Sequence, residues 1–154
     1  MNELQQNIIK WAEGKGIFAN SDPISQFLKT ISEVGELADA VNKNDLPEIK
    51  DAIGDVAVTL ILYHKMLNTK LVLSNETSGG FYSDIKLEIQ RLSYYIGQIA
   101  EIQLVPFNYL AVDMLAGIAS YYGWTLQECL ESAYDVISKR TGKMENGVFI
   151  KDAQ

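Results

Sequence analysis

Two long helical patterns joined by a short turn make up much of the first half of the sequence. Asp22 followed by Pro23 combines a capping side chain with a proline at the first helical position, and the apolar pattern after them predicts a helix that runs to about Asn44. Pro47 marks the start of a second helix that continues to about Asn68. Because so few residues separate the two helices, we expect them to lie antiparallel as a helical hairpin.

The remaining sequence adds further helical patterns and no convincing strand. A capping box at Thr125–Glu128 starts a last helix that ends before Gly142, and the tail at 147–150 is expected to be extended at most. The other helical patterns span residues 2–13, about 83–103 and about 107–122. We therefore expect an all-α antiparallel bundle of about six helices, in which residues 1–154 form a single domain and residues 70–122 contain an extra helical pair of unplaced role.

Composition limits the chemistry that such a fold can support. Lys and Arg total 13 against 20 Asp and Glu, and the resulting net charge of −7 disfavours binding to duplex nucleic acid. The longest apolar stretch, Val56–Tyr63, is too short to span a bilayer, so we expect a soluble cytoplasmic protein with no membrane partner. The chain has one histidine, His64, which disfavours His-rich metal centres and Ser-His-Asp catalysis. We expect His64 to be packed in the core or at an interface, and the single cysteine, Cys129, to be a small packed side chain. Any catalysis therefore rests on carboxylates.

The first helix of the hairpin has one apolar stripe at helical spacing. Its members are Ile24, Phe27, Leu28, Ile31, Val34, Ala38 and Val41. Glu33 and Glu36 fall on the opposite side, in line with Gln26, Lys29 and Ala40. Taken alone, this arrangement is typical of a solvated acidic face.

The second helix of the hairpin is apolar nearly all round. Asp51 and Asp55 point away from its main stripe, yet their line continues through Val58 and Leu62 instead of polar residues. Carboxylates at the end of a buried face need a neutralising cation, which Lys29 supplies in part and a divalent metal ion supplies more fully. One partner helix cannot cover such a helix, so we expect a helical dimer or a larger oligomer.

The register of the hairpin brings the two acidic pairs together. Glu36 lies nine residues before Asp45 in the turn and Asp55 lies ten residues after it, so both are expected at the same height. Glu33, Glu36, Asp51 and Asp55 then form a four-carboxylate site, with Gly35 and Gly54 allowing close approach between the pairs. Oxygen ligands without histidine or thiolate suit Mg²⁺, with Mn²⁺ as an alternative, and Mg²⁺ takes its remaining ligands from water and substrate phosphates.

The residues of this hairpin carry a family resemblance. Glu33-Val34-Gly35-Glu36, followed by Asp51-Ala52-Ile53-Gly54-Asp55, resembles the Glu-x-x-Glu plus Glu-x-x-Asp signature of the all-α NTP pyrophosphatases, the MazG-like superfamily. The last helix and tail, from Glu128 to Phe149, resemble the same region of phage-type members. The similarity covers about 22–62 and 125–150.

The resemblance implies a Mg²⁺-dependent enzyme that cleaves nucleoside triphosphates between the α and β phosphates, as a homodimer or homotetramer. It implies metal ligation by Glu33, Glu36 and Asp55, with Glu33 or Glu36 orienting or deprotonating the attacking water. The family's first acidic residue of the second motif falls on Ala52, and Asp51 is the nearest substitute. Substrate binding is assigned to Lys29, Lys139, Arg140 and Lys143, with Trp11 either stacking on the base or packing in the core.

Two other classes of function stay open. A catalytically silent module that binds a nucleotide or a protein partner is suggested by Ala52 and by Asp135 and Ser138, which stand where amide and lysine residues are usual in the family. A purely structural helical oligomer is disfavoured, because it gives Asp51 and Asp55 no reason to lie on an apolar face.

Overall fold

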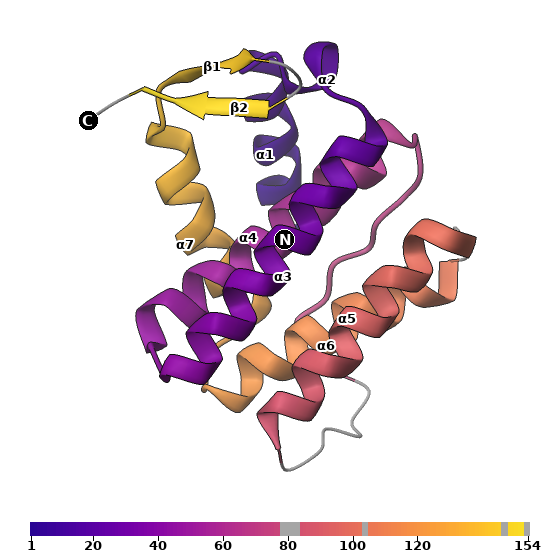
Figure 1. Cartoon of the computed structure of the whole chain (residues 1–154), viewed down its shortest axis with the longest axis vertical. Helices are drawn as coiled ribbons and strands as arrows, with labels where there is room; N and C mark the ends of the chain where they lie inside the picture. The colour runs from indigo at the N-terminus through magenta and orange to yellow at the C-terminus, as the bar shows by residue number, and fades with distance from the viewer. Residues whose placement is uncertain (78–83, 103–104, 146–147, 153–154) are drawn as a thin grey trace.

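The computed structural model describes residues 1–77, 84–102, 105–145 and 148–152. Within these residues the chain forms seven helices and one antiparallel β-hairpin (Figure 1). The elements are α1 (Asn2–Gly14), α2 (Ile17–Asn20), α3 (Pro23–Lys43), α4 (Leu46–Met66), α5 (Ile85–Ile102), α6 (Val105–Tyr121), α7 (Leu126–Lys139), β1 (Gly142–Glu145) and β2 (Val148–Lys151). The expected all-α class is confirmed.

Local capping signals place the helix starts where the sequence predicts them. The Asp22 carboxylate accepts hydrogen bonds from the backbone N–H groups of Ile24 (2.9 Å) and Ser25 (3.0 Å) at the start of α3. At α7, the Thr125 hydroxyl accepts from the N–H of Glu128 and the Glu128 carboxylate accepts from the N–H of Thr125, which completes the capping box. These starts depend on neighbouring residues, so a sequence pattern is sufficient to locate them.

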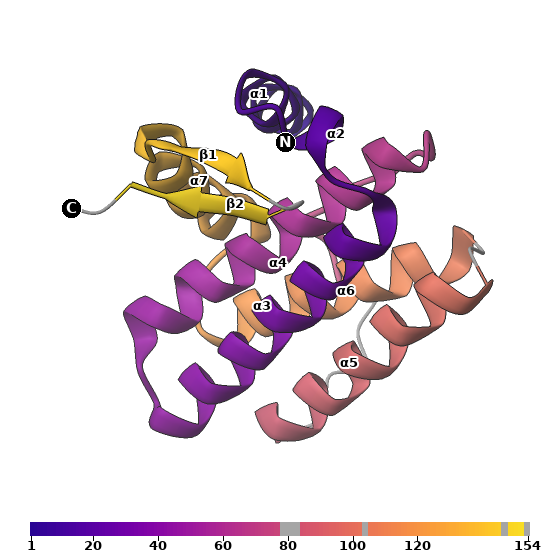
Figure 2. The same ribbon diagram turned by 45° about the horizontal axis from the view of Figure 1, so that its top comes forward.

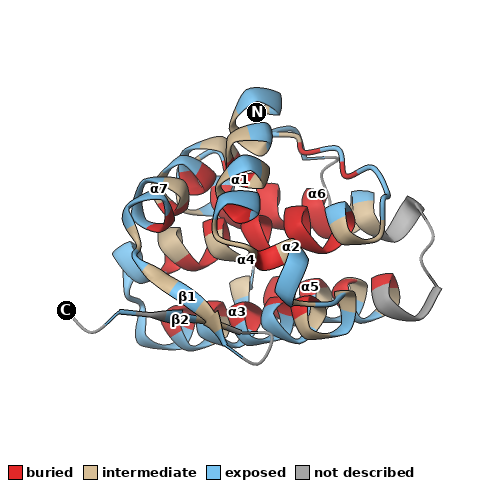
Figure 3. Cartoon of the chain, turned by 90° about the horizontal axis from the view of Figure 1, so that it is seen from above, coloured by how far each residue is buried: buried red, intermediate tan, exposed pale blue. Residues whose placement is uncertain are grey.

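Helix α4 is the centre of the fold. It packs against α3, α7, α1 and α6 of the same chain, and every residue from Ala52 to His64 except Asp55 is buried (Figure 3). The expectation that α4 needs a second chain to cover it is therefore wrong, because α6 and α7 close the faces that α3 leaves open.

The predicted apolar stripe of α3 does not coincide with its buried face. Ile24, Leu28 and Ile31 are 75%, 63% and 42% exposed, so this part of the stripe faces outward. Val34 and Val41 of the predicted stripe are buried. The full set of buried residues of α3 is Gln26, Thr30, Glu33, Val34, Leu37, Ala40 and Val41. Glu33, which a solvated acidic face would explain if α3 stood alone, is buried, because α3 packs against α4 and α5.

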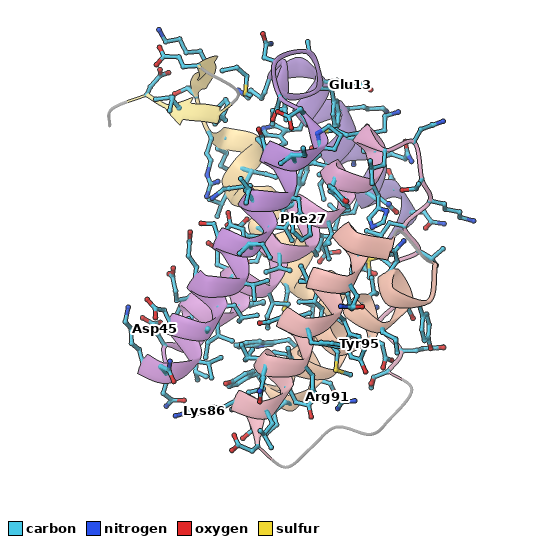
Figure 4. The ribbon with its side chains drawn as sticks, turned by 45° about the vertical axis from the view of Figure 1, so that its right-hand side comes forward. Glu13, Phe27, Asp45, Lys86, Arg91 and Tyr95 are labelled. Atoms are coloured by element: carbon cyan, nitrogen blue, oxygen red, sulfur yellow. The ribbon has the colours of Figure 1, made fainter. Side chains whose placement is uncertain are left out.

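The extra helical pair packs onto the α3–α4 hairpin. Helices α5 and α6 contact each other, while α5 contacts α3 and α6 contacts α4 and α7 (Figures 1 and 2). Phe27 of α3 lies against Tyr63 of α4 with ring centroids 5.5 Å apart, and Figure 4 places it on the side of α3 that faces the rest of the bundle. Buried residues of all these helices belong to one hydrophobic core.

The C-terminal region forms a β-hairpin that the sequence did not predict. Strands β1 and β2 pair antiparallel, with Met144 opposite Phe149, beyond the end of α7 (Figure 2). Phe149 packs edge-to-face on Trp11, with ring centroids 6.4 Å apart. The expectation of a tail without strands is wrong because this contact and the half-buried Met144 give the strands a hydrophobic support that lies far away in the sequence.

Within the described residues, none of the helices combines the length and the continuous apolar character that a membrane span requires.

Candidate carboxylate site

Three of the four predicted carboxylates lie on the two packed helices α3 and α4 and are coupled electrostatically. Glu33 of α3 is only 5% exposed, while Asp51 and Asp55 of α4 are half-buried. The charges of Glu33 and Asp51 both act on Asp55, so the three side chains share one electrostatic environment. Glu36 is exposed and is not among the charges that shift the pKa of Asp55.

Asp55 is the most strongly perturbed carboxyl group of this cluster. Its burial, followed by the negative charges of Glu33 and Asp51, raises its pKa from 3.8 to about 7. The positive charges of Arg140 and Lys29 act in the opposite direction and lower the pKa in part. Burial and neighbouring negative charges disfavour the ionised form of this carboxyl group, and a bound cation would stabilise that form.

Lys29 and Glu33 form an ion pair across one turn of α3. The Glu33 side chain is 7% exposed and the Lys29 side chain is 53% exposed, so the buried carboxylate is neutralised by an ammonium group that reaches in from the surface. The expectation of a cationic partner concerned Asp51 and Asp55, and there Lys29 acts on Asp55, whose pKa its positive charge lowers.

The other predicted substrate-binding residues lie at the end of α7 and in the β-hairpin. Arg140, the half-buried C-cap of α7, is close enough to Asp55 to lower its pKa. Lys139 is exposed in the last turn of α7, and Lys143 is exposed on β1, where it pairs with Glu145 at 2.8 Å. Trp11 is half-buried against Phe149. The structure thus brings Lys29 and Arg140 to the carboxylates.

Position 52 belongs to the hydrophobic core. Ala52 is 5% exposed, whereas Asp51, one residue earlier, is half-buried and acts on Asp55. A carboxylate at position 52 would have to enter the core, while the side chain at position 51 lies beside the cluster. This placement supports the hypothesis that Asp51 is the substitute for the missing acidic residue.

The donor chemistry of the cluster fits a hard divalent cation. Its three potential ligands are carboxylates, and the negative charges of Glu33 and Asp51 act on Asp55. As the side chains stand, no three Asp, Glu, His or Cys residues of the described ranges are grouped tightly enough to hold a metal ion. Lys29 pairs with Oε1 of Glu33. A carboxylate can accept a further contact through its second oxygen.

His64 lies outside this cluster and lines a cavity that contains none of the cluster carboxylates. Its Nδ1 lies 2.8 Å from the Thr69 hydroxyl, while its buried Nε2 has no hydrogen-bond partner within the described protein atoms. Burial lowers the pKa of His64 to about 4, so the ring is neutral near physiological pH. The cavity has a volume of about 480 Å³ and is lined by residues of α1, the end of α4 and the segment at 69–72. The expectation of a packed histidine is confirmed, although only one ring nitrogen has a partner.

Sequence reasoning missed the buried charges of the extra helical pair. Glu88 of α5 is fully buried and pairs with Arg91 at 3.1 Å, and Asp113 of α6 is 3% exposed. The three-residue spacing of Glu88 and Arg91 indicates an ion pair on one face of α5. The same spacing is common on solvated helices, so it does not indicate that the pair is buried. Their burial depends on how α5 meets α6, which no local pattern reveals.

The α3–α4 hairpin lies in a part of the chain that is similar to a known domain family. Residues 22–77 match the family model described as the MazG nucleotide pyrophosphohydrolase domain, which confirms the predicted family resemblance for this part of the chain. This match contains α3, α4 and the segment that follows them.

A relative from a bacteriophage aligns with about half of the chain. It is the "Uncharacterized 18.2 kDa protein in rep-hol intergenic region" of Haemophilus phage HP1 (strain HP1c1) and is 38% identical over 73 residues. The aligned region makes up 47% of this chain, and the chain spans 45% of the length of that relative. No solved structure gave a significant match.

Proposed function

We propose that this chain is a divalent-metal-dependent nucleoside triphosphate pyrophosphohydrolase that releases a nucleoside monophosphate and pyrophosphate. The observation that supports this most directly is the gathering of Glu33, Asp51 and Asp55 from two helices of the matched region, beside Lys29 and Arg140. Acidic ligands flanked by basic side chains are what a metal–triphosphate complex requires.

Each residue of the cluster has a role in this proposal. Glu33, Asp51 and Asp55 would hold Mg²⁺ or Mn²⁺, with Glu36 on the exposed rim of the same helix face. When bound, the cation would neutralise phosphate charge in the substrate and its leaving group. Arg140 and Lys29 would bind phosphate oxygens, and Glu33 or Glu36 would orient or deprotonate the water that attacks the α-phosphorus.

The test is a comparison of two products. The purified protein is incubated with the common ribo- and deoxyribonucleoside triphosphates and Mg²⁺, and pyrophosphate and orthophosphate are measured separately. The proposal expects pyrophosphate, loss of turnover with a chelator, and loss of turnover in Asp55→Asn but not in Asp39→Asn, which changes an exposed carboxylate elsewhere on α3. Release of orthophosphate alone, or no turnover with any nucleotide, contradicts it.

A second candidate is a catalytically silent module that binds a nucleotide or a protein partner. The burial of Ala52, where the family has a carboxylate, favours it. Calorimetry separates the two candidates, because a silent module binds nucleotide and Mg²⁺ without forming pyrophosphate. Partner capture without nucleotide binding would identify a protein-binding module instead.

We also propose that the chain assembles as a homodimer or homotetramer. The observation that supports this assembly is the exposed apolar stripe of α3, formed by Ile24, Leu28 and Ile31.

A further inference from the structure

The cavity beside His64 is formed by α1, the end of α4 and the segment at 69–72. Its volume of about 480 Å³ lies within the range of sites that bind small organic molecules. None of the three cluster carboxylates, Glu33, Asp51 and Asp55, lines it. Binding in this cavity is therefore independent of the proposed function.

The charge of the cavity wall is opposite to that of the whole chain. The chain has 20 acidic and 13 basic residues, yet Lys65 and Lys70 line the cavity and no Asp or Glu of the described residues does. Both lysines are exposed, and neither takes part in an ion pair of the described residues. Two ammonium groups without carboxylate partners at one cavity favour an anionic ligand.

The remainder of the wall is apolar with a few amide groups. Ile61 and Leu71 are buried, Ile9 is half-buried, and all three line the cavity. Gln5 and Gln6 lie beside them, and the Gln5 amide donates a hydrogen bond to the Leu71 carbonyl oxygen at 3.3 Å. An apolar surface with a small number of polar groups suits an organic anion better than a bare inorganic ion.

His64 adds a hydrogen-bond acceptor to the same wall. Its Nδ1 lies 2.8 Å from the Thr69 hydroxyl, and that hydroxyl lies 3.3 Å from the His64 carbonyl oxygen. A hydroxyl has one hydrogen, so both contacts are hydrogen bonds only if Nδ1 donates to Thr69 and Thr69 donates to the carbonyl. In this neutral ring Nε2 has a lone pair and no hydrogen, and it is buried without a partner among the described residues. A group that satisfies Nε2 therefore has to bring an N–H or O–H.

We propose that this cavity is a second binding site, for a small organic anion that carries an N–H or O–H donor. The anionic group would pair with Lys65 and Lys70, the body of the ligand would lie on the apolar wall, and its donor would bond Nε2 of His64. A nucleoside monophosphate combines a phosphate, a flat ring and N–H or O–H groups. We assign the cavity to this class of ligand.

The experiment excludes metal-dependent binding by working in a chelator. The full chain is titrated calorimetrically with the nucleoside monophosphates of the common bases, with the corresponding nucleosides and with orthophosphate. The variants are Lys65→Met, Lys70→Met and Lys86→Met, the last removing an exposed lysine of α5 that does not line the cavity (Figure 4). The chain has one histidine, so the imidazole signals in nitrogen NMR spectra belong to His64 alone.

The expected result is binding that depends on all three parts of the ligand. At least one monophosphate should bind, and its nucleoside and orthophosphate should each bind at least about tenfold more weakly. Lys65→Met and Lys70→Met should each weaken the monophosphate Kd about fivefold, while Lys86→Met should stay within about twofold of the natural chain. The NMR spectra should show the hydrogen on Nδ1, and the Nε2 signal should move when the monophosphate binds, because that nitrogen then accepts a hydrogen bond. Thermal unfolding checks that each variant is folded, and glutamine replaces methionine in a variant that does not fold.

Absence of binding by every monophosphate, or equal weakening by the three lysine variants, would overturn the proposal. Orthophosphate that binds as tightly as the monophosphate would also overturn it, since the apolar wall would then contribute nothing. A hydrogen on Nε2, or an Nε2 signal that binding leaves unchanged, would contradict the role of His64 and with it the assigned class of ligand. Pyrophosphate release in Mg²⁺ is measured separately and decides the proposed function whatever these titrations show.

Discussion

Gly54 of α4 lies directly against the backbone of Cys129 in α7. A Cβ atom at position 54 would overlap the Cys129 carbonyl oxygen and would lie 2.7 Å from the Cβ atom of Ala133. Gly35 of α3 is exposed, and a Cβ atom there would meet nothing within 4 Å. The expectation that both glycines let the two helices of the hairpin approach closely is therefore wrong, because Gly54 brings α4 against α7, next in sequence to Asp55. The alternative that a ligand approaches at these glycines stays a prediction.

This contact predicts opposite effects for two identical substitutions. Gly54→Ala should destabilise the fold by about 3 kcal/mol, because the obstacle is backbone and cannot rotate away. Gly35→Ala should stabilise it by about 0.5–1 kcal/mol, through helix propensity alone. Urea unfolding followed by circular dichroism measures both. A neutral Gly54→Ala would show that α7 can move away from α4 at little cost.

Local structure was predictable where its cause was local. The Asp22 cap, the Thr125–Glu128 capping box and the turn at Asp45 involve residues a few positions apart, and the structure has all three. Figure 4 places Asp45 at the end of the α3–α4 hairpin, as the sequence predicts. Helix α2 was missed because its four residues are too short for a periodic signal.

The orientation of α3 was not predictable from its own sequence. Its most apolar line contains Ile24 and Leu28, both largely exposed, while its buried line contains Gln26 and Glu33. Hydrophobic periodicity identifies the face that is apolar, but the contacts with α4 and α5 determine the face that is buried. Glu33 thus stays a predicted site residue, and its burial became visible only in the fold.

Asp55 and His64 should produce opposite pH dependences of stability. The pKa of Asp55 is raised in the folded chain to about 7, so its contribution to stability is present below about pH 4 and is lost as the pH rises to 7. The pKa of His64 is lowered from 6.5 to about 4, so its contribution is present above pH 6.5 and is lost as the pH falls to 4. Between these limits the two effects oppose each other.

Two variants separate these contributions in the presence of a chelator. His64→Gln should leave the effect of Asp55, so that stability falls by about 1 kcal/mol per pH unit between about pH 4.5 and 6.5. Asp55→Asn should leave the effect of His64, so that stability rises over the same interval. Urea unfolding at several pH values is the measurement. Identical slopes in the two variants would mean that neither pKa is shifted as described.

The exposed stripe of α3 predicts how the chain self-associates. Leu28→Lys places a charge in the middle of the stripe and should weaken the assembly at least about tenfold. Val136→Lys is the matched control, because Val136 is an exposed apolar residue of α7, outside the stripe, and is 44% exposed. Light scattering over a concentration series measures both. A natural chain that stays monomeric, or equal effects of the two variants, would exclude this stripe as the interface.

The last prediction concerns the substitution of Asp51 for the missing carboxylate at position 52. Asp51→Asn keeps the shape of the side chain and removes its charge beside Asp55, so turnover should fall about 100-fold while the melting temperature changes little. Ala52→Glu restores the residue type of the family signature but places it in the core, where Ala52 is 5% exposed, and it should destabilise the fold by about 3 kcal/mol. Pyrophosphate release and thermal unfolding are measured on both variants. Full activity in Asp51→Asn would leave Glu33 and Asp55 as the carboxylates on which turnover depends. A folded and more active Ala52→Glu would instead show that α4 can present position 52 to the cluster, and that the natural chain lacks a ligand there.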